Sequence, residues 1–319
     1  MDKQQYVLEK ITSAGGGRYL EEFLSFPRYF QIETIQACNA RCVMCGIEEW
    51  KRENAKMEDW IFEKILAEIK EHIGEIQRVS AFLGGEPLLD KGIAKKIALL
   101  KQAKVPSVYI TTNASLLDRD RALELLQSGI DQVDISFDSL DQQIYEKIRV
   151  NLKFKVVRDN ILSFIALRNQ GGYKTRIRIR MTEMDCNNKE LQRMQEYFAP
   201  YLILEGDCVY SKDLQVAFME SGITQEKKDF VGEKSYALSK LNCEALPCYA
   251  IWNTIVILSD GRVGLCCVDM GRNVIIGDLR KSSIQEIWRE SKELRAIRKT
   301  HLEVGRGGVL VCKGCNTWS

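Results

Sequence analysis

Apolar residues recur with two different periods along the first two thirds of the chain. Short stretches that alternate or are rich in β-branched residues predict strands, and stretches with apolar residues every three to four positions predict helices. About six βα units in succession predict a parallel sheet, open or curled into a partial barrel, because such crossovers are right-handed. The expected strands span 29–35, 78–83, 107–112, 132–137, 175–181 and 202–205, and the expected helices span 58–73, 91–104, 118–128, 155–169 and 187–198.

The pattern changes after residue 205. Residues 206–247 are polar and irregular, residues 252–267 predict a β-hairpin whose Asp260-Gly261 pair suits a tight primed turn, and an amphipathic helix is expected near 283–299. The expected fold class is α/β: a partial (β/α)6 barrel with a small cysteine-rich C-terminal domain made of a β-hairpin and a helix. The expected divisions are an N-terminal extension at 1–28, the barrel at 29–205, a bridging region at 206–240 and the small domain at 241–319.

The charge balance argues against some classes of partner. The 319 residues carry 46 Lys+Arg and 44 Asp+Glu, so a net charge of +2 offers no basic stripe for a nucleic acid. The longest apolar runs, such as 255–258, fall far short of the ~18 residues of a membrane span, and the first residues lack a secretory signal. We therefore expect a cytoplasmic protein with neither nucleic-acid nor membrane partners, whose eleven cysteines serve metal ligation or redox chemistry.

Three of the cysteines lie together directly after the first expected strand. Cys38, Cys42 and Cys45 form a CxxxCxxC pattern, in which three thiolates can bind one metal centre and leave a coordination position open. A zinc knuckle with a distant fourth ligand, or three unrelated buried cysteines, would give the same pattern. Further motifs end the next three strands, where they could cap turns or bind a ligand. They are Gly84-Gly85-Glu86-Pro87, Thr111-Thr112-Asn113, and Ser136 with Asp138.

Together these motifs resemble the radical S-adenosylmethionine (SAM) superfamily over nearly the whole chain. The resemblance implies that Cys38, Cys42 and Cys45 hold a [4Fe-4S] cluster by three irons, and that SAM chelates the fourth. It also implies that the glycines bring bare backbone close to the SAM amino group. One departure is Met44, where many family members carry an aromatic residue. The residues expected to contact SAM at the strand ends are Gly84, Gly85, Glu86, Thr112, Asn113, Ser136 and Asp138.

An arginine on the fifth strand of this family reaches the SAM carboxylate. Arg176, Arg178 and Arg180 all lie on one face of the expected strand, because side chains alternate with a period of two. Alternation therefore does not choose between them, and two of the three could simply face solvent. We take Arg180 as the candidate because it lies nearest the end of the strand.

A second group of cysteines is expected in the small domain. Cys248, Cys266, Cys312 and Cys315 resemble the Twitch form of the SPASM extension, which implies four thiolates around an auxiliary [4Fe-4S] cluster. Such a cluster would transfer electrons or position substrate. A zinc ribbon uses the same ligands at similar spacing and remains an alternative.

The other cysteines and the histidines have no partner spacing. Cys186 and Cys208 are interpreted as ordinary buried or surface residues, and Cys243 is the replacement if Cys248 is not a ligand. His72 and His301 lie in polar, helix-like contexts and are expected to be solvated.

Cys267 is the candidate catalytic residue. The family resemblance implies that a 5′-deoxyadenosyl radical removes a hydrogen atom from the substrate, and the outcome depends on how the substrate radical is quenched. If neighbouring side chains in the hairpin strand alternate, Cys266 faces its cluster and Cys267 faces the barrel mouth. A thiol there could donate a hydrogen atom to the opposite face of the substrate radical and so epimerise the substrate. The Cys-Cys pair resembles that of neomycin C epimerase and of peptide epimerases, which implies this role for Cys267. The alternative is loss of an electron to give a ketone or cross-link, as in 2-deoxy-scyllo-inosamine dehydrogenase, whose Twitch spacing is similar.

The sequence says less about the substrate and partners. Only some thirty residues precede the first strand, whereas peptide-modifying relatives often carry an N-terminal recognition domain, so a carbohydrate or aminocyclitol is favoured. A peptide substrate remains open. The resemblance also implies an electron donor such as flavodoxin or ferredoxin. A non-catalytic zinc- or cluster-binding protein is the remaining alternative, and it would not need the motifs at the strand ends.

Overall fold

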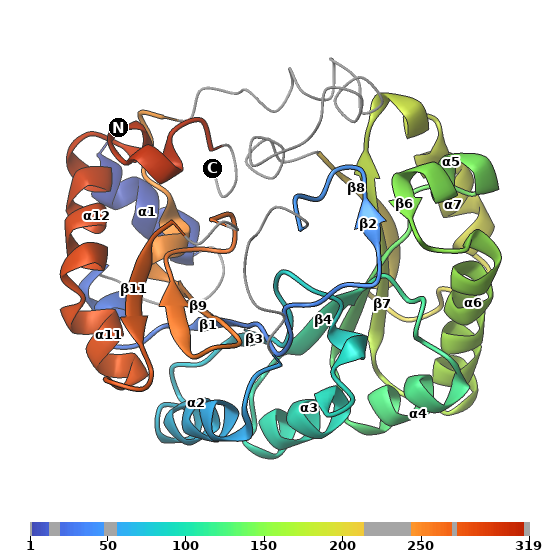
Figure 1. Ribbon diagram of the computed structural model, residues 1–319, viewed down its shortest axis with the longest axis horizontal. Coiled ribbons are helices and arrows are strands. Elements are labelled where there is room, and N and C mark those ends of the chain that lie inside the picture. The colour runs from blue at the N-terminus through green and yellow to red at the C-terminus, as the bar shows by residue number, and fades with distance from the viewer. Residues whose placement is uncertain (1, 13–19, 48–55, 214–243, 270–272, 316–319) are drawn as a thin grey trace.

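The computed structural model describes residues 2–12, 20–47, 56–213, 244–269 and 273–315. Within them, nine strands form one curved sheet in the order β11-β10-β9-β1-β3-β4-β5-β7-β8. Figure 1 shows α2, α3, α4 and α6 along the outer side of the curve, with the small domain at one end of the sheet. No helix of the described residues is long and apolar enough to cross a membrane.

Six neighbouring strands are parallel and form the barrel half of the sheet, which confirms the expected α/β partial barrel. They are β1 (Tyr29–Ile32), β3 (Arg78–Ser80), β4 (Val108–Thr112), β5 (Gln132–Ser136), β7 (Arg176–Glu183) and β8 (Cys208–Asp213). The connecting helices are α2 (Asp59–Glu71), α3 (Ile93–Gln102), α4 (Arg119–Gln127), α5 (Gln142–Ile148), α6 (Phe154–Gln170) and α7 (Glu190–Phe198). Of these, the sequence did not predict α5.

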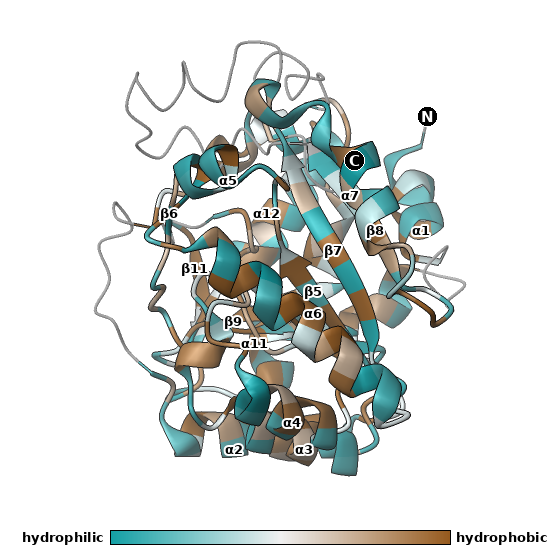
Figure 2. Cartoon of the chain, turned by 90° about the vertical axis from the view of Figure 1, so that its right-hand side faces the viewer, coloured by the Kyte–Doolittle hydropathy of each residue, from teal (hydrophilic) through white to brown (hydrophobic). Residues whose placement is uncertain are grey.

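Alternation along β7 shows how the sequence builds this layer. Ile177, Ile179 and Met181 are buried in the core, whereas the arginines between them are more accessible. The bands of alternating hydropathy along β7 are visible in Figure 2. Because the apolar set packs on the helices, the three arginines face the inner side of the barrel.

The sixth barrel strand begins later than predicted. Residues 202–205 form no strand, and β8 starts at Cys208, inside the stretch that we expected to bridge the domains. The reason is a turn at Gly206 (φ +87°) and Asp207. The Asp207 carboxylate accepts hydrogen bonds from Leu204 N (3.0 Å) and Ile177 N (2.8 Å) and pairs with buried Arg168. These contacts fix the chain in a loop until it meets β7.

The small domain continues the barrel sheet. Its strands are β9 (Thr254–Ile257), β10 (Arg262–Gly264) and β11 (Ile275–Asp278), and β9 pairs in parallel with β1 from Tyr29↔Thr254 to Ile32↔Ile257. Strand β10 is antiparallel to both of its neighbours, so the predicted hairpin is present. The barrel and the small domain therefore share one hydrogen-bonded framework.

The hairpin turn is not of the predicted primed type. Gly261 has φ +83°, and of residues 258–262 it alone has positive φ. Leu258 N donates to Arg262 O (2.9 Å) and Gly261 N donates to Leu258 O (3.0 Å), so the loop has three residues ending in a left-handed glycine. A primed two-residue turn would need positive φ at Asp260 as well.

The predicted helix at 283–299 is two helices. They are α11 (Ile284–Glu290) and α12 (Lys292–Glu303), and the chain breaks at Ser291, whose hydroxyl caps Leu294 N at 3.3 Å. The N-terminal segment packs on this region through α1 (Lys3–Thr12) and through Trp288 Nε1, which donates to Phe23 O at 2.9 Å.

Candidate active site

The three-cysteine loop follows β1 and is held by a short two-stranded ladder. Strand β2 (Arg41–Cys42) pairs with β6 (Arg149–Val150), which places Cys42 opposite Arg149. The pKa of Cys38 is raised to about 11 and that of Cys45 to about 12, mainly by burial and to a smaller extent by neighbouring groups that include Cys42. The structure therefore holds the three predicted ligands in one loop, where Cys38 and Cys45 keep their protons until a metal displaces them.

Arg149 is a functional residue that sequence reasoning missed. Its Nη1 donates to Cys42 Sγ at 3.3 Å, and its Nε forms an ion pair with Asp138. Burial opposes the charge, but Asp138 and Cys42 hold the pKa of Arg149 well above its ordinary value. The carboxylate of Asp138, which is predicted to contact SAM, accepts hydrogen bonds from Arg149 and from Thr182 N (2.7 Å). No local sequence signal marks this contact, because it depends on the pairing of β2 with β6.

The glycine-rich motif packs directly against the cysteine loop. A Cβ on Gly85 would lie 2.5 Å from Ala37 O and 2.6 Å from Ile35 O, and Glu86 N donates to Ala37 O at 2.8 Å. Gly84 is half-buried in the same turn. Close backbone approach is therefore required here for the fold of the loop itself.

Glu86 ties the ends of β3 and β4 together. Its carboxylate accepts hydrogen bonds from Thr112 Oγ1 (2.6 Å) and from Asn113 N (2.8 Å), and burial raises its pKa. The next residue, Ala114, has φ +57°, a conformation that costs a non-glycine residue roughly 1 kcal/mol. It is held there by Thr112 Oγ1, which accepts from Ala114 N, and by Asn160 Nδ2, which donates to Ala114 O.

A ring of polar side chains links this strand end to the cysteine loop. Asn113 Nδ2 donates to Asn39 Oδ1 (3.0 Å), Asn39 Nδ2 donates to Ser115 Oγ (2.8 Å), and Ser115 Oγ donates to Asn113 Oδ1 (2.6 Å). Asn39 and Ser115 were not predicted, although their positions inside the cysteine motif and beside Asn113 could have suggested them.

The three arginines of β7 have different environments. Arg176 is exposed, and Arg178 is paired with Asp134 on β5 (Nε to Oδ1, 2.8 Å). Arg180 donates to Ser136 Oγ (3.2 Å), and its buried Nε has no hydrogen-bond partner among the described residues. Although β7 continues to Glu183, an orphan guanidinium N–H on the inner face of a barrel strand is the kind of donor that a carboxylate satisfies, so Arg180 and Ser136 fit the carboxylate of SAM.

The segments that carry the four predicted ligands of the small domain approach one another. Cys248 precedes the 3-10 turn Tyr249–Trp252, Cys266 follows β10, and Cys315 N donates to Cys312 O at 3.2 Å. Burial raises the pKa of Cys248 to about 11, that of Cys312 to about 12, and that of Cys266 well above its ordinary value. The charge of other cysteines in the set also raises the pKa of each of these three thiols.

No three Cys, His, Asp or Glu side chains of the described residues converge tightly enough to hold a single metal ion. A zinc ion and an iron-sulfur cluster both take thiolate ligands of this kind. The replacement ligand Cys243 lies outside the described residues. Cys186 lies in the 3-10 turn Asp185–Asn187 and Cys208 begins β8, each away from both cysteine sets along the chain.

Arg306 and His301 contact the backbone near the second cysteine set, which the sequence did not predict for either residue. Buried Arg306 donates to Pro247 O and to Cys315 O, both at 3.1 Å, and so joins the segments that carry Cys248 and Cys315. His301 is fully buried and accepts a hydrogen bond from Cys248 N at 3.1 Å. Burial, and then Arg306, lower the pKa of His301 to about 4.

The expectation that both histidines are solvated is wrong. His301 lies on the inner face of α12, which packs against the segment after Cys248. His72 is half-buried and stacks on Phe26 with ring centroids 4.0 Å apart. Both histidines occupy packing positions that a polar sequence context does not reveal.

Cys267 follows Cys266 in the segment after β10 and is half-buried. Strand β10 ends at Gly264, after a register shift, so the alternation expected for Cys266 and Cys267 does not apply. A charge on Cys267 would add to the effect of burial and raise the pKa of Cys266 and of Cys248. It also acts on two barrel residues, adding to the effect of burial on the pKa of Tyr109 and opposing the lowering of the Lys212 pKa by burial and Arg180.

The cysteine motifs and the fold match known families. The model of the radical SAM superfamily matches residues 32–196, and that of the SPASM iron-sulfur cluster-binding domain matches residues 248–316. The chain spans about half the length of the curated relatives it matches. It is 28% identical over 170 residues to a probable GTP 3′,8-cyclase of Methanococcus maripaludis, covering 53% of this chain and 54% of that protein. It is 34% identical over 138 residues to a GTP 3′,8-cyclase of Campylobacter lari, covering 42% and 39%.

Solved structures share the fold over most of the chain. BtrN in complex with AdoMet and 2-DOIA has a TM-score of 0.58 at 17% identity, covering 91% of this chain and 93% of BtrN. Streptococcus suis SuiB bound to S-adenosylmethionine has a TM-score of 0.62 at 18% identity, covering 98% and 76%. The expected cofactors, SAM and iron-sulfur clusters at a SAM-binding and an auxiliary site, are thereby confirmed. The chain belongs to the radical SAM superfamily, and it is an enzyme with a SPASM-type iron-sulfur domain.

Proposed function

We propose that this radical SAM enzyme epimerises one carbon centre of a carbohydrate- or aminocyclitol-type molecule, with Cys267 as the hydrogen donor. The observation that supports the proposal is the half-buried position of Cys267 next to Cys266, the predicted auxiliary ligand, close enough for a charge on it to influence the pKa of Tyr109 on β4 and of Lys212 on β8. We propose that this thiol faces the substrate in the barrel and lies beside the auxiliary cluster.

The hydrogen balance of this reaction assigns each step to a group. When bound, SAM and its cluster supply the radical that removes one hydrogen atom from the substrate carbon. The S–H bond of Cys267 then breaks, and its hydrogen atom bonds to the opposite face of that carbon. The sulfur radical returns to a thiol by taking up one proton and one electron. We propose that the electron comes from a flavodoxin- or ferredoxin-type donor by way of the auxiliary cluster.

The inner surface of the barrel supports a polar substrate. Barrel interiors are usually filled by branched apolar residues, but here the inner face carries Asp134, Tyr210 and Lys212, the last by its register opposite Thr182. Tyr210 OH donates to Asp134 Oδ2 at 3.3 Å, and no acidic partner for Lys212 is found in the described part of the chain. Hydroxyl and amino groups of a sugar would find donors and acceptors here.

A peptide substrate and a second reaction, dehydrogenation, are the competing candidates. BtrN was solved with the small molecule 2-DOIA, which supports a small substrate, and SuiB was solved with its precursor peptide SuiA, which favours a peptide. Dehydrogenation is the second reaction candidate, since an auxiliary cluster beside Cys267 could also accept an electron from the substrate radical. The curated GTP 3′,8-cyclases match about half of the chain, which supports the shared barrel and not a shared substrate.

Turnover in D2O with a panel of amino sugars and aminocyclitols tests the proposal. The wild-type enzyme should give product with one deuterium at the inverted carbon and otherwise unchanged mass. Cys267→Ala should retain both clusters and SAM cleavage but give no inverted product, whereas the control Cys186→Ala should turn over normally. Inversion by Cys267→Ala contradicts the donor role. A product two hydrogens lighter than the substrate identifies a dehydrogenase.

A further inference from the structure

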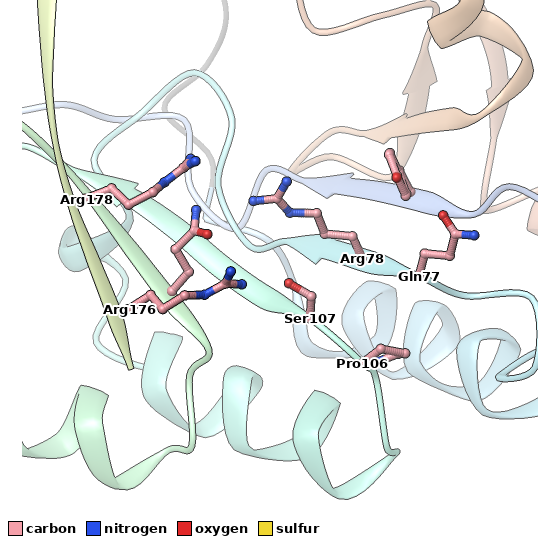
Figure 3. Close-up of a pocket in the computed structure, with 8 residues that line it drawn as sticks. Gln77, Arg78, Pro106, Ser107, Arg176 and Arg178 are labelled. Carbon is pink, nitrogen blue, oxygen red and sulfur yellow. The ribbon is translucent and has the colours of Figure 1, made fainter. Parts of the chain in front are cut away.

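A cavity opens at the end of the barrel opposite the cysteine loop. It is lined by residues at or just before the starts of five neighbouring parallel strands, β1, β3, β4, β5 and β7, and Figure 3 shows these side chains. The SAM-binding motifs lie at the other ends of these strands. The cavity has a volume of about 490 Å³, which is within the range of small-molecule sites.

The charge of this cavity is positive. Arg78, Arg176 and Arg178 enter it from β3 and β7, and no Asp or Glu is among the described residues that line it. Arg178 is neutralised by its pair with Asp134. Neither Arg78 nor Arg176 has an acidic partner in the described ranges, so two cationic charges remain uncompensated. The other polar lining groups, Gln77, Gln132 and Ser107 among them, are neutral and can donate hydrogen bonds.

Arg78 is held in place before any ligand arrives. Its guanidinium lies over the Tyr109 ring, 3.9 Å from the ring centroid, and its Nε is buried without a hydrogen-bond partner in the described part of the chain. Arg176 lies across the opening and points toward Ser107 in Figure 3. A stacked guanidinium loses less conformational freedom on binding than a mobile lysine would, which favours a site over a merely solvated face.

We propose that this cavity binds a small phosphate-bearing anion through Arg78 and Arg176. Two uncompensated guanidinium groups match a dianion, and the fork of each matches the oxygens of a phosphate. Ser107 supplies a further polar contact at the wall, whereas Gln132 Nε2 donates to Asp134 Oδ1 at 2.8 Å. Asp134, which holds Arg178 at the cavity edge, also accepts the hydrogen bond of Tyr210 inside the barrel. A bound anion would therefore act on a side-chain network that reaches the substrate side, independently of the proposed epimerisation.

Calorimetric titration of the intact, cluster-loaded enzyme tests this site. The probes are inorganic phosphate, glucose 6-phosphate and AMP, each in a chloride buffer at fixed ionic strength, so that a free ion and a phosphate ester can be told apart. We expect saturable binding of one ligand per chain. Arg78→Gln and Arg176→Gln should each weaken it by about 10-fold or more, because a charged hydrogen bond is lost. Arg289→Gln, which removes an exposed arginine of α11, should leave it unchanged.

The outcomes separate clearly. Tighter binding of an ester than of inorganic phosphate identifies an esterified ligand, and equal binding identifies the free ion; both support the site. Absence of saturable binding by all three probes overturns the proposal. So does equal weakening by Arg289→Gln, which would indicate a general charge effect. Because Arg176 is exposed, retained SAM cleavage by Arg176→Gln verifies that this variant folds. Binding is measured without turnover, so failure of the epimerase proposal would not affect the result.

Discussion

The two cysteine sites of this enzyme are built in opposite ways. Cys38, Cys42 and Cys45 lie on one loop, where their short spacing along the chain keeps the thiols close. The second set comes from three segments between Cys248 and Cys315, and only tertiary contacts bring them together. Each site also has a buried arginine, but the two arginines contact different atoms.

That difference assigns the arginines different roles. Arg149 donates to a ligand sulfur, so it acts on the charge of the first site. Arg306 donates to the carbonyl oxygens of Pro247 and Cys315, so it holds the segments of the second site together. At the first site, where the cysteines are close in sequence, the arginine acts on the charge of a thiol. At the second site, where they are far apart in sequence, the arginine joins the segments that carry them.

Removing the ligands of the first site should have the largest effect on chemistry. Changing Cys38, Cys42 and Cys45 together to alanine should abolish reductive SAM cleavage, because no thiolate remains to hold the SAM-binding cluster. Iron in the small domain should stay. The measurements are 5′-deoxyadenosine formation and iron per chain, with Cys186→Ala as control. Retained cleavage in the triple variant would show that the site is assigned wrongly.

Removing ligands of the second site should affect the fold as well as the iron. The Cys312→Ala, Cys315→Ala double variant should lose roughly half of the bound iron and lose turnover, because one of two four-iron clusters is gone. The small domain should also become more sensitive to protease, since a site closed by metal contributes folding energy. Cys208→Ala is the matched control. A full complement of both clusters in the double variant would refute the ligand assignment.

The role of Arg149 can be tested through its charge. Arg149→Gln should lower the free energy of unfolding by about 3–5 kcal/mol, because Asp138 is left buried without a cation. It should also lower the reduction potential of the SAM-binding cluster, because a hydrogen bond to a ligand sulfur is lost. The potential is measured by an EPR-monitored redox titration and stability by denaturant unfolding.

The control for Arg149 is a second substitution at its partner. Adding Asp138→Asn should recover part of the stability, since the unpaired charge is removed, while the potential stays low. If Arg149→Gln leaves the potential of the first cluster unchanged, Arg149 acts only on the fold, as we expect for Arg306.

Two glycine substitutions, one beside each cysteine site, should have the smallest effects on stability and iron content. Gly85→Ala would bring a Cβ within 2.5 Å of Ala37 O beside the first site, and Gly305→Ala would bring one within 2.3 Å of Glu244 O beside the second. Each should cost about 1–3 kcal/mol of stability through overpacking. Iron should be lost from the adjacent site only. Gly74→Ala, which meets nothing within 4 Å, is the control, and cross-loss of iron would mean that the sites are not independent.

Much of the barrel and of the first site could be predicted from sequence. The order of strands and helices, the inward arginines of β7 and the three-cysteine loop all depend on residues close together in the chain. The position of β8 could not be predicted, because the buried pair of Arg168 with Asp207 decides where the preceding turn ends. For Cys267 the alternation argument fails where β10 ends, and the side chain is located only by the charges that surround it.

The sequence by itself determined the periodic layers of the fold, the ligand residue types and the short spacing of the SAM-binding cysteines. These follow from bond geometry and from the burial of apolar side chains, which act over a few residues. The tertiary structure alone decided that Arg149 meets Cys42, that Arg306 closes the second site and that His301 is buried. Such contacts join residues far apart in the chain, and only the packed sheet sets their register and distance.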